Sequence, residues 1–442
     1  MVIFAEFKNL KMRKIAFTSL VLASSMVFAQ ENQSAKDSMV ISNKKELDSL
    51  KLEIQSLKEM MAASSANKKE EKKASKWYDK ISFGGYIQVR YNEFLETNPE
   101  LDCEQCDPYW GKGADGISFR RVRFKFEGQI LPRVYFYLQP DFTKVVGSSR
   151  YIATLQDAYL DVGLNSKNEY KIRLGQSKLP FGYEIMQSSS ERIPLDRSDA
   201  INSSVKGERD FGMYFMWTGQ KRKDIMSEIK DKGLKHSGDF GVFAFGFYNG
   251  QAANNTDKNK KFHWLTRISY PFRLGQQILE PSIQAYTGKY VIPQVSTGVK
   301  VNNNGEYIDQ RIAASFVLYP QPFGIQIEYN IGKGPQYNHN TNSIEAKNLY
   351  GGYAMFSYYI KKWNQLFIPF MRLQHYNGAK KHELDARSYN MKQFELGVEW
   401  APFKALEITA VYTYSDRAHK DFVNPNYHEK GSVVRLQAQL KF

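Results

Sequence analysis

The amino-acid sequence predicts an all-β protein: a 16-stranded antiparallel transmembrane β-barrel preceded by a short N-terminal helical or coiled-coil segment. Three observations support this prediction. The N-terminus has the pattern of an export signal. From residue 81 onward, apolar and polar residues alternate with a period of two, as in strands that face two different environments. The chain ends with such a strand, residues 431–442, whose last residue is Phe442.

Composition excludes two other classes of protein. Mean hydropathy is -0.52, and only one stretch near the N-terminus is apolar enough to resemble a membrane helix. This excludes a bundle of membrane helices. Aromatic residues make up 14% of the chain, which is too many for a disordered protein.

Residues 1–29 have the features of a signal peptide. Arg13 and Lys14 precede an apolar stretch from Ile15 to Phe28, and the small residue Ala29 follows it. The stretch is too short to span a bilayer comfortably. We therefore expect residues 1–29 to be removed on export, with the mature chain placed in the bacterial outer membrane.

Residues 30–80 are predicted to form a periplasmic helical or coiled-coil segment and a linker. Apolar residues recur three and four positions apart at Leu47, Leu50, Ile54, Leu57 and Met61, which is the a/d stripe of a helix. Such a helix could pair with other copies of itself or pack on its own barrel, and the sequence favours neither. The Ser-, Ala-, Lys- and Glu-rich residues up to position 76 indicate a flexible connector.

Residues 81–442 are predicted to form the barrel. Their alternation indicates sixteen strands, at 82–95, 118–130, 134–143, 153–162, 170–178, 209–218, 239–249, 262–270, 278–288, 308–319, 323–332, 348–360, 366–376, 390–401, 405–415 and 431–442. The connections alternate between long and short, as outer and periplasmic connections do in such barrels. The segment Gly219–Gly238 is long where a short turn is expected, and a periplasmic helix over Lys223–Leu234 would account for it.

The alternation also predicts which side chains face water. In the second strand Arg121, Arg123 and Lys125 alternate with apolar residues, and a cation at the bilayer midplane costs about 2–4 kcal/mol. We therefore expect them to line the lumen, which is wide enough in a 16-stranded barrel to hold water. By the same facing rule the other lumen cations are Arg90, Lys171, Arg173, Arg267, Arg311 and Arg372. The residues expected to face lipid include Phe136, Leu138, Leu160, Val162, Phe211, Met213, Phe215 and Trp217.

The longest connection, residues 179–208, is expected to fold into the lumen and narrow it. It carries Arg192 and Arg197 as candidate anion-binding residues. Some lumen arginines are also expected to pair with acids such as Glu127, Asp157 and Asp161. For each cation, a structural ion pair and an ion-binding role are equally supported.

Other sites are weakly indicated or excluded. Cys103 and Cys106 form a C-x-x-C in the first outer loop, and a disulfide is expected there because a metal site would need a second pair. No motif for a catalytic site, a metal site or a cofactor is present, so we expect a passive process and no enzyme. The basic residues alternate within strands and form no single patch, which argues against nucleic acid.

Several motifs of this sequence resemble those of the phosphate-selective porins O and P. The resemblance is specific over residues 83–215 and rests on Phe83–Gln88, Phe119–Gly128, Asp157–Asp161, Arg173–Gln176, Lys178–Gly182 and Glu208–Gly212. It implies a trimeric outer-membrane porin that passes inorganic phosphate, polyphosphate or other small anions through a lumen lined by Arg and Lys. The matched basic positions are Arg121, Arg123, Lys125, Lys178 and Arg209. The last strand, ending at Phe442, resembles the signal that the outer-membrane barrel assembly machinery reads.

Two alternatives remain open. The protein could be a general, non-selective porin, or a structural or adhesive outer-membrane barrel with a plugged lumen.

Overall fold

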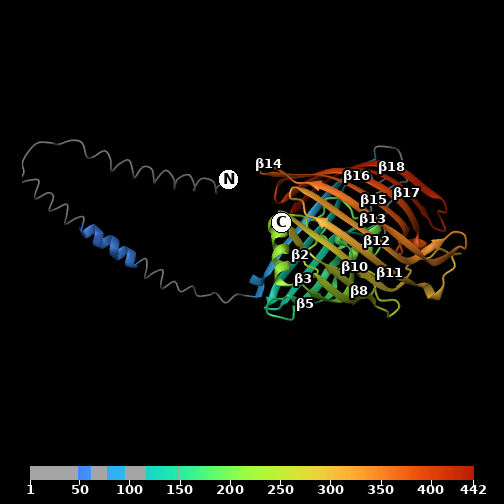
Figure 1. Cartoon of the computed structure of the whole chain (residues 1–442), viewed down its shortest axis with the longest axis horizontal. Coiled ribbons are helices and arrows are strands. Elements are labelled where there is room, and N and C mark those ends of the chain that lie inside the picture. Colours follow the sequence, from blue (N-terminus) through green and yellow to red (C-terminus); the bar gives the residue numbers. More distant parts are fainter. Residues whose placement is uncertain (1–47, 61–76, 95–115, 147–148) are drawn as a thin grey trace, which may run out of the picture. The chain divides into compact units, whose positions relative to one another are not determined.

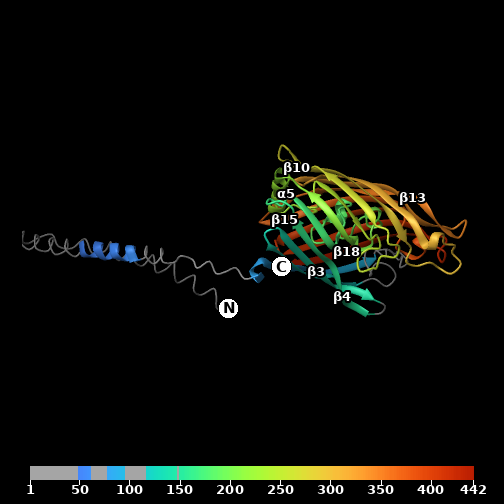
Figure 2. The same ribbon diagram turned by 90° about the horizontal axis from the view of Figure 1, so that it is seen from below.

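The computed structural model describes residues 48–60, 77–94, 116–146 and 149–442. From residue 77 onward, these residues form a barrel of long antiparallel strands (Figures 1 and 2). Its strands are β1 Ile81–Phe94, β2 Gly116–Leu131, β3 Val134–Val146, β4 Ser149–Gly163, β5 Tyr170–Lys178, β6 Arg209–Trp217, β7 Phe243–Tyr248, β8 His263–Ser269, β9 Phe272–Leu274, β10 Gln277–Val291, β11 Glu306–Leu318, β12 Phe323–Asn338, β13 Ser343–Tyr358, β14 Ile360–Lys362, β15 Gln365–Ala379, β16 Ser388–Phe403, β17 Leu406–Lys420 and β18 Tyr427–Lys441. Its helices are η1 Trp77–Lys80, α3 Tyr183–Met186, α4 Asp199–Asn202, η2 Lys206–Glu208, α5 Gln220–Asp231, η3 Asn303–Gly305 and η4 Leu384–Ala386.

The eighteen strand segments of the described chain make sixteen barrel strands. β8 and β9 both pair with β10, so they are one strand interrupted at Tyr270 and Pro271. β13 and β14 both pair with β15 and are one strand interrupted at Tyr359. Each of the sixteen predicted spans coincides with one of these barrel strands, so the predicted fold class is confirmed.

The barrel closes where β1 pairs with β18. The register runs from Tyr86 opposite Lys441 to Phe94 opposite Val433. Phe442 extends the seam, because its N–H donates to the Gly85 carbonyl (3.1 Å) and its own carbonyl accepts from the Gly85 N–H (2.9 Å). Its ring also lies 5.9 Å from that of Phe124, centroid to centroid. The terminal aromatic residue is thus part of the closure itself.

The two faces of the strands are sorted as predicted. Most of the side chains expected to face lipid are exposed, among them Leu138, Leu160, Phe211 and Trp217. All of the lumen arginines predicted from facing are buried, with exposed fractions of 6% or less. Some predicted long connections are shorter than expected, since the strands continue: β12 and β13 pair as far as Asn338 and Ser343, leaving only a turn of residues 339–342.

The predicted N-terminal helix is confirmed over residues 48–60. Leu50, Ile54 and Leu57 of its apolar stripe are about half exposed, at 52%, 51% and 54%. The sequence leaves two partners open for this stripe, other copies of the helix or the chain's own barrel, and neither is tested by the described residues. The expected signal peptide (1–29) and the expected Cys103–Cys106 disulfide lie outside the described residues. In the described part of the chain, no helix is long and apolar enough to cross a membrane.

The long segment after β6 contains the expected helix, α5, which begins three residues before the predicted start and ends at Asp231. It ends there because Gly233, with a φ of 68°, provides a left-handed cap. The Leu234 N–H donates to the Ile229 carbonyl (3.0 Å) and the Gly233 N–H to the Lys230 carbonyl (2.9 Å), as in a Schellman motif. Figures 1 and 2 show α5 and the C-terminus at the same end of the barrel, which we call the short-turn end.

Residues 179–208, between β5 and β6, lie inside the barrel, as expected, and we call them the lumen loop. Apolar side chains of the loop, including Leu179, Phe181 and Ile185, are fully buried against inward-facing residues of the strands. Polar contacts then fix it to four strands on the far wall. These contacts join Tyr183 N to Glu328 Oε1 (2.8 Å), Glu184 to Arg372 (2.9 Å), Asp199 to Arg417 (2.9 Å) and Ser203 Oγ to Arg311 (2.8 Å).

Candidate functional site

A cluster of arginines forms where the lumen loop faces β1 and β2. Arg90 comes from β1, Arg121 and Arg123 from β2, and Arg192 and Arg197 from the loop. The period of two turns the three strand residues inward, and the anchored loop brings the other two to them. All five are at least 94% buried. The structure therefore assembles five of the predicted site residues in one place.

One further arginine joins the cluster through a β-bulge. The register of β1 and β2 shifts so that Gln88 faces Arg121 while Val89 faces Phe119, which leaves Arg120 as the extra residue. Its guanidinium lies 3.4 Å from the Asp196 carboxylate of the lumen loop. Strict alternation would have turned Arg120 outward, so the sequence analysis missed it. A run of two arginines before the alternating segment was the only signal.

Most of the predicted cations are held in ion pairs. The expected pairing of lumen arginines with Asp157 and Asp161 is confirmed, at 3.0 Å to Arg209 and 2.7 Å to Arg173. Glu127 instead pairs with Lys125 (2.6 Å) and with no arginine of the described chain. The other pairs are Arg90–Asp196 (3.0 Å), Arg123–Asp141 (2.6 Å), Arg197–Glu208 (2.5 Å), Arg267–Glu280 (3.0 Å) and Arg372–Glu395 (2.6 Å). Each of these pairs has little net charge, because the carboxylate offsets the charge of the cation.

Asp196 illustrates how tightly the loop is bound to the wall. Its carboxylate contacts Arg90, Arg120 and Arg435, the last at 2.6 Å. Burial alone would raise the pKa of this carboxyl, but the three guanidinium groups hold it well below its usual range. The loop is therefore anchored by a charged carboxylate at neutral pH.

Four predicted cations have no carboxylate within ion-pair distance among the described residues, and one of them, Arg311, is instead hydrogen-bonded to the lumen loop. Arg121 donates one hydrogen bond, to Gln88 Oε1 (2.8 Å), and Lys178 donates one to the Met186 carbonyl (3.1 Å). None of the three guanidinium nitrogens of Arg192 has a hydrogen-bond partner in the described structure, although the residue is only 4% exposed.

The two unpaired arginines of the cluster repel each other electrostatically. Burial and the neighbouring Arg197 lower the pKa of Arg192 to about 9. More distant carboxylates partly oppose this shift, namely those of Asp196, Glu184 and Glu208. A buried guanidinium without a partner is costly, so this position favours an anion as the missing partner. Arg192 and Arg121 are therefore the strongest candidate anion site.

Arg267, Arg311 and Arg372 face the lumen as predicted but serve the loop and the wall. Arg311 donates to the Ala200 carbonyl (3.1 Å) and to the Ser203 hydroxyl, and Arg372 bridges Glu184 and Glu395. No ion pair or hydrogen bond within the described chain links the three arginines to Arg121 or Arg192. Their predicted anion-binding role remains untested, whereas their contacts show an anchoring role.

A second basic region lies at the short-turn end of the lumen. A cavity of about 300 Å³ lies between β3, β4 and β5 and the segment that contains α5. Its charged lining residues are the cations Arg133, Lys171, Arg173 and Lys223 and the acids Asp161 and Asp239. The lining of this cavity therefore carries more positive than negative charge.

Residues 232–242, which we call the strap, re-enter the lumen after α5. The Lys235 ammonium lies 2.8 Å from Glu399 of β16 and 2.9 Å from Glu407 of β17. These carboxylates belong to strands far around the barrel from β6 and β7, so the strap spans the interior. Burial opposes the charge of Lys235, but the two carboxylates hold its pKa well above its ordinary value.

The strap gives a prediction for pH. Lys171, the Thr218 hydroxyl and the Gly241 N–H stabilise the Asp239 carboxylate against burial and lower its pKa to about 2. An unfolded aspartate has a pKa of about 3.9, so this carboxylate contributes stability above about pH 4 that is lost as the pH falls toward 2. We expect Asp239→Asn to lower the thermal unfolding midpoint at neutral pH. The difference from wild type should vanish near pH 2, and a constant difference would contradict the assignment.

No group of three or more His, Cys, Asp or Glu side chains that could hold a metal ion occurs in the described ranges. Residues that the sequence analysis missed are those whose role depends on distant contacts: Arg120, Asp196, Lys235, Arg417 and Arg435. Apart from the two consecutive arginines at Arg120, no local pattern distinguishes them from other charged residues of the alternating strands and loops.

Comparison with known proteins places this geometry in a family. A family model, phosphate-selective porin O and P, matches residues 94–442. Among solved structures, the chain is similar to the outer membrane channel DcaP of Acinetobacter baumannii, with a TM-score of 0.53 and 14% identity over 82% of this chain and 97% of that one. It is also similar to OmpF of Salmonella typhi, solved in complex with Daunomycin, with a TM-score of 0.51 and 10% identity over 82% and 97% of the two chains.

At such identities the structural likeness shows the fold alone. Comparison with curated protein sequences gives no significant match. The family match, however, covers more than three quarters of the sequence, and both the family and the fold are those of channel proteins. The chain therefore belongs to the phosphate-selective porin O and P family of outer-membrane channels.

Proposed function

We propose that this channel is a passive, anion-selective pore for phosphate or polyphosphate. The observation that carries the proposal is the pair Arg121 and Arg192, two buried arginines in the lumen with no carboxylate partner among the described residues. A guanidinium matches phosphate oxygens with a planar fork of donors, which a chloride ion cannot use as fully. The field of unpaired cations in a narrow space also raises the local concentration of anions.

The rest of the arrangement supports a path for the anion. Lys178 adds a third unpaired cation at the base of the lumen loop, and the basic cavity near Lys171 lies at the short-turn end. The paired arginines hold the loop in place so that Arg192 stays fixed in the lumen. No nucleotide or cofactor motif occurs in the sequence, so we propose diffusion down a gradient.

The cellular setting is proposed on the sequence and on the family resemblance. The mature chain would follow signal-peptide cleavage, insert through the assembly machinery that reads the strand ending at Phe442, and form a homotrimer in the outer membrane. The packing of Phe442 against the seam supports a role for that residue in closure.

The decisive experiment is the reversal potential of the purified channel in a planar bilayer under a KCl gradient, followed by titration of the current with phosphate. We expect anion selectivity and a saturable block by phosphate. Anion selectivity without block would indicate a general anion porin, and absence of selectivity would indicate a non-selective porin. A barrel with no conductance would support the plugged, structural alternative, in which the lumen loop and the strap block the lumen.

A further inference from the structure

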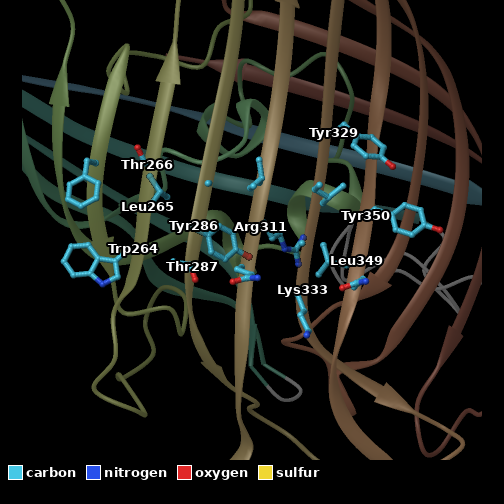
Figure 3. Close-up of a pocket in the computed structure, with 17 residues that line it drawn as sticks. Trp264, Leu265, Thr266, Tyr286, Thr287, Arg311, Tyr329, Lys333, Leu349 and Tyr350 are labelled. Atoms are coloured by element: carbon cyan, nitrogen blue, oxygen red, sulfur yellow. The ribbon is translucent and has the colours of Figure 1, made fainter.

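The outer wall of the barrel has a cavity of about 830 Å³ between β7 and β13 (Figure 3). Figure 3 shows Trp264 on one side of it and Tyr329 and Tyr350 on the other. These three side chains are 47%, 42% and 45% exposed, so they point away from the lumen. We call this cavity the outer groove.

The outer groove exists because small side chains lie between large ones. Thr266 of β8 faces Ala285 of β10 across the strands, and both belong to the outward set. Ala285 in turn faces Ile312 of β11, and the larger side chains Tyr329 of β12 and Tyr350 of β13 lie beyond it. The groove therefore results from the order of small and large outward side chains, and it crosses several strands within the apolar band.

One end of the outer groove is polar. Lys333 of β12 faces Gln310 of β11 and Asn348 of β13 across the strands, and all three lie in the groove lining. Lys333 is exposed, and no carboxylate lies within ion-pair distance of it among the described residues. The outward lysine nearest to the groove on β10 differs, since Lys289 pairs with Glu306 (3.2 Å).

We propose that the outer groove binds an anionic membrane lipid, with an acyl chain along the aromatic walls and the phosphate of its headgroup at Lys333. A hollow in the lipid-facing wall is filled by chains because voids forfeit van der Waals contacts. Apolar chains alone do not discriminate between lipids, so the selectivity comes from the unpaired cation and the two amides beside it. A lysine near an anionic headgroup corresponds to about a fivefold preference.

The test uses Trp264 as a reporter at the groove wall. The full-length chain would keep Trp264 as its only tryptophan, with Phe at the five other positions, and would be reconstituted in phosphatidylcholine vesicles. Quenching by a minor fraction of brominated phosphatidylglycerol is compared with quenching by the same fraction of brominated phosphatidylcholine. We expect about a fivefold higher relative binding constant for the anionic lipid. A chain that keeps only Trp217, which is outward-facing on β6, should show no preference.

Two further variants separate charge from shape. Lys333→Gln should abolish the preference, whereas Lys289→Gln, which removes an outward lysine already paired with Glu306, should leave it unchanged. Ala285→Phe should fill the floor and reduce quenching by both lipids. The matched change Ala314→Phe, on the outer face but outside the groove lining, should not reduce it.

Two results would overturn the proposal. Equal quenching of Trp264 by the two lipids would mean that the outer groove has no headgroup preference. Absence of quenching by either lipid, with normal quenching of Trp217, would mean that another protein surface, such as a second copy of this chain, covers the groove.

Discussion

Replacing Arg192 with alanine is expected to weaken the block of the channel by phosphate by about tenfold to a hundredfold. Arg192 is buried in the lumen loop, and no partner in the described structure satisfies its guanidinium. A phosphate at this position would accept charged hydrogen bonds that no carboxylate of the protein competes for. The measurement is the phosphate concentration that halves the chloride current in a planar bilayer.

Two control variants test whether the effect depends on the guanidinium of Arg192 and on its place in the lumen. Arg192→Lys keeps the charge but lacks the planar fork, so the half-blocking concentration should lie between those of wild type and Arg192→Ala. Lys362→Ala removes an exposed cation from the outward face of β14 and should change nothing. If phosphate blocks the Arg192→Ala channel at the same concentration as the wild-type channel, Arg192 is not part of the binding site.

Arg372→Met is expected to give the largest loss of stability, because it leaves two buried carboxylates without their common partner. Arg372 lies 2.9 Å from Glu184 of the lumen loop and 2.6 Å from Glu395 of β16, and all three side chains are at most 1% exposed. Breaking a buried pair of this kind costs about 3–5 kcal/mol. The loop also loses an anchor, so we expect a larger and noisier single-channel conductance together with a lower unfolding temperature.

The matched control is the exposed ion pair of Arg273 with Glu228 on α5. Because Arg273 is 53% exposed, Arg273→Met should cost about 1 kcal/mol or less and leave the conductance unchanged. Adding Glu184→Gln to Arg372→Met should recover part of the stability, since Glu184 is the carboxylate left without an ion pair, whereas Glu395 keeps Arg435 (3.1 Å). A wild-type unfolding temperature and conductance for Arg372→Met would show that the loop does not depend on this anchor.

The strands were predictable because each one lies between lipid and a polar interior, which imposes a period of two on the sequence. The interruptions were not predicted. Pro271, which lacks an N–H to donate, stands at the break between β8 and β9, but Tyr359, at the break between β13 and β14, carries no such signal. The helix in the long segment after β6 was predicted, but not its end, which the cap at Gly233 determines.

The candidate site was predictable only in part. Alternation places Arg121 and Arg123 on the same face, yet Arg123 is neutralised by Asp141 while Arg121 is not. That difference arises from the register of β2 against β3 and from the fold of the lumen loop, neither of which leaves a local pattern. The same holds for Arg192, whose isolation becomes visible only when the loop is seen inside the barrel.

The seam between β1 and β18 has a consequence for biogenesis. The hydrogen bond that joins Gln88 to Gln439 connects residues 351 positions apart, so closure waits for nearly the whole polypeptide to arrive. Until then both seam strands expose unpaired N–H and C=O groups, which are templates for aggregation. These strand edges therefore need shielding until β1 and β18 pair. Loss of residues 433–442, about one fortieth of the sequence, would remove every register pair between β1 and β18 and leave the barrel open.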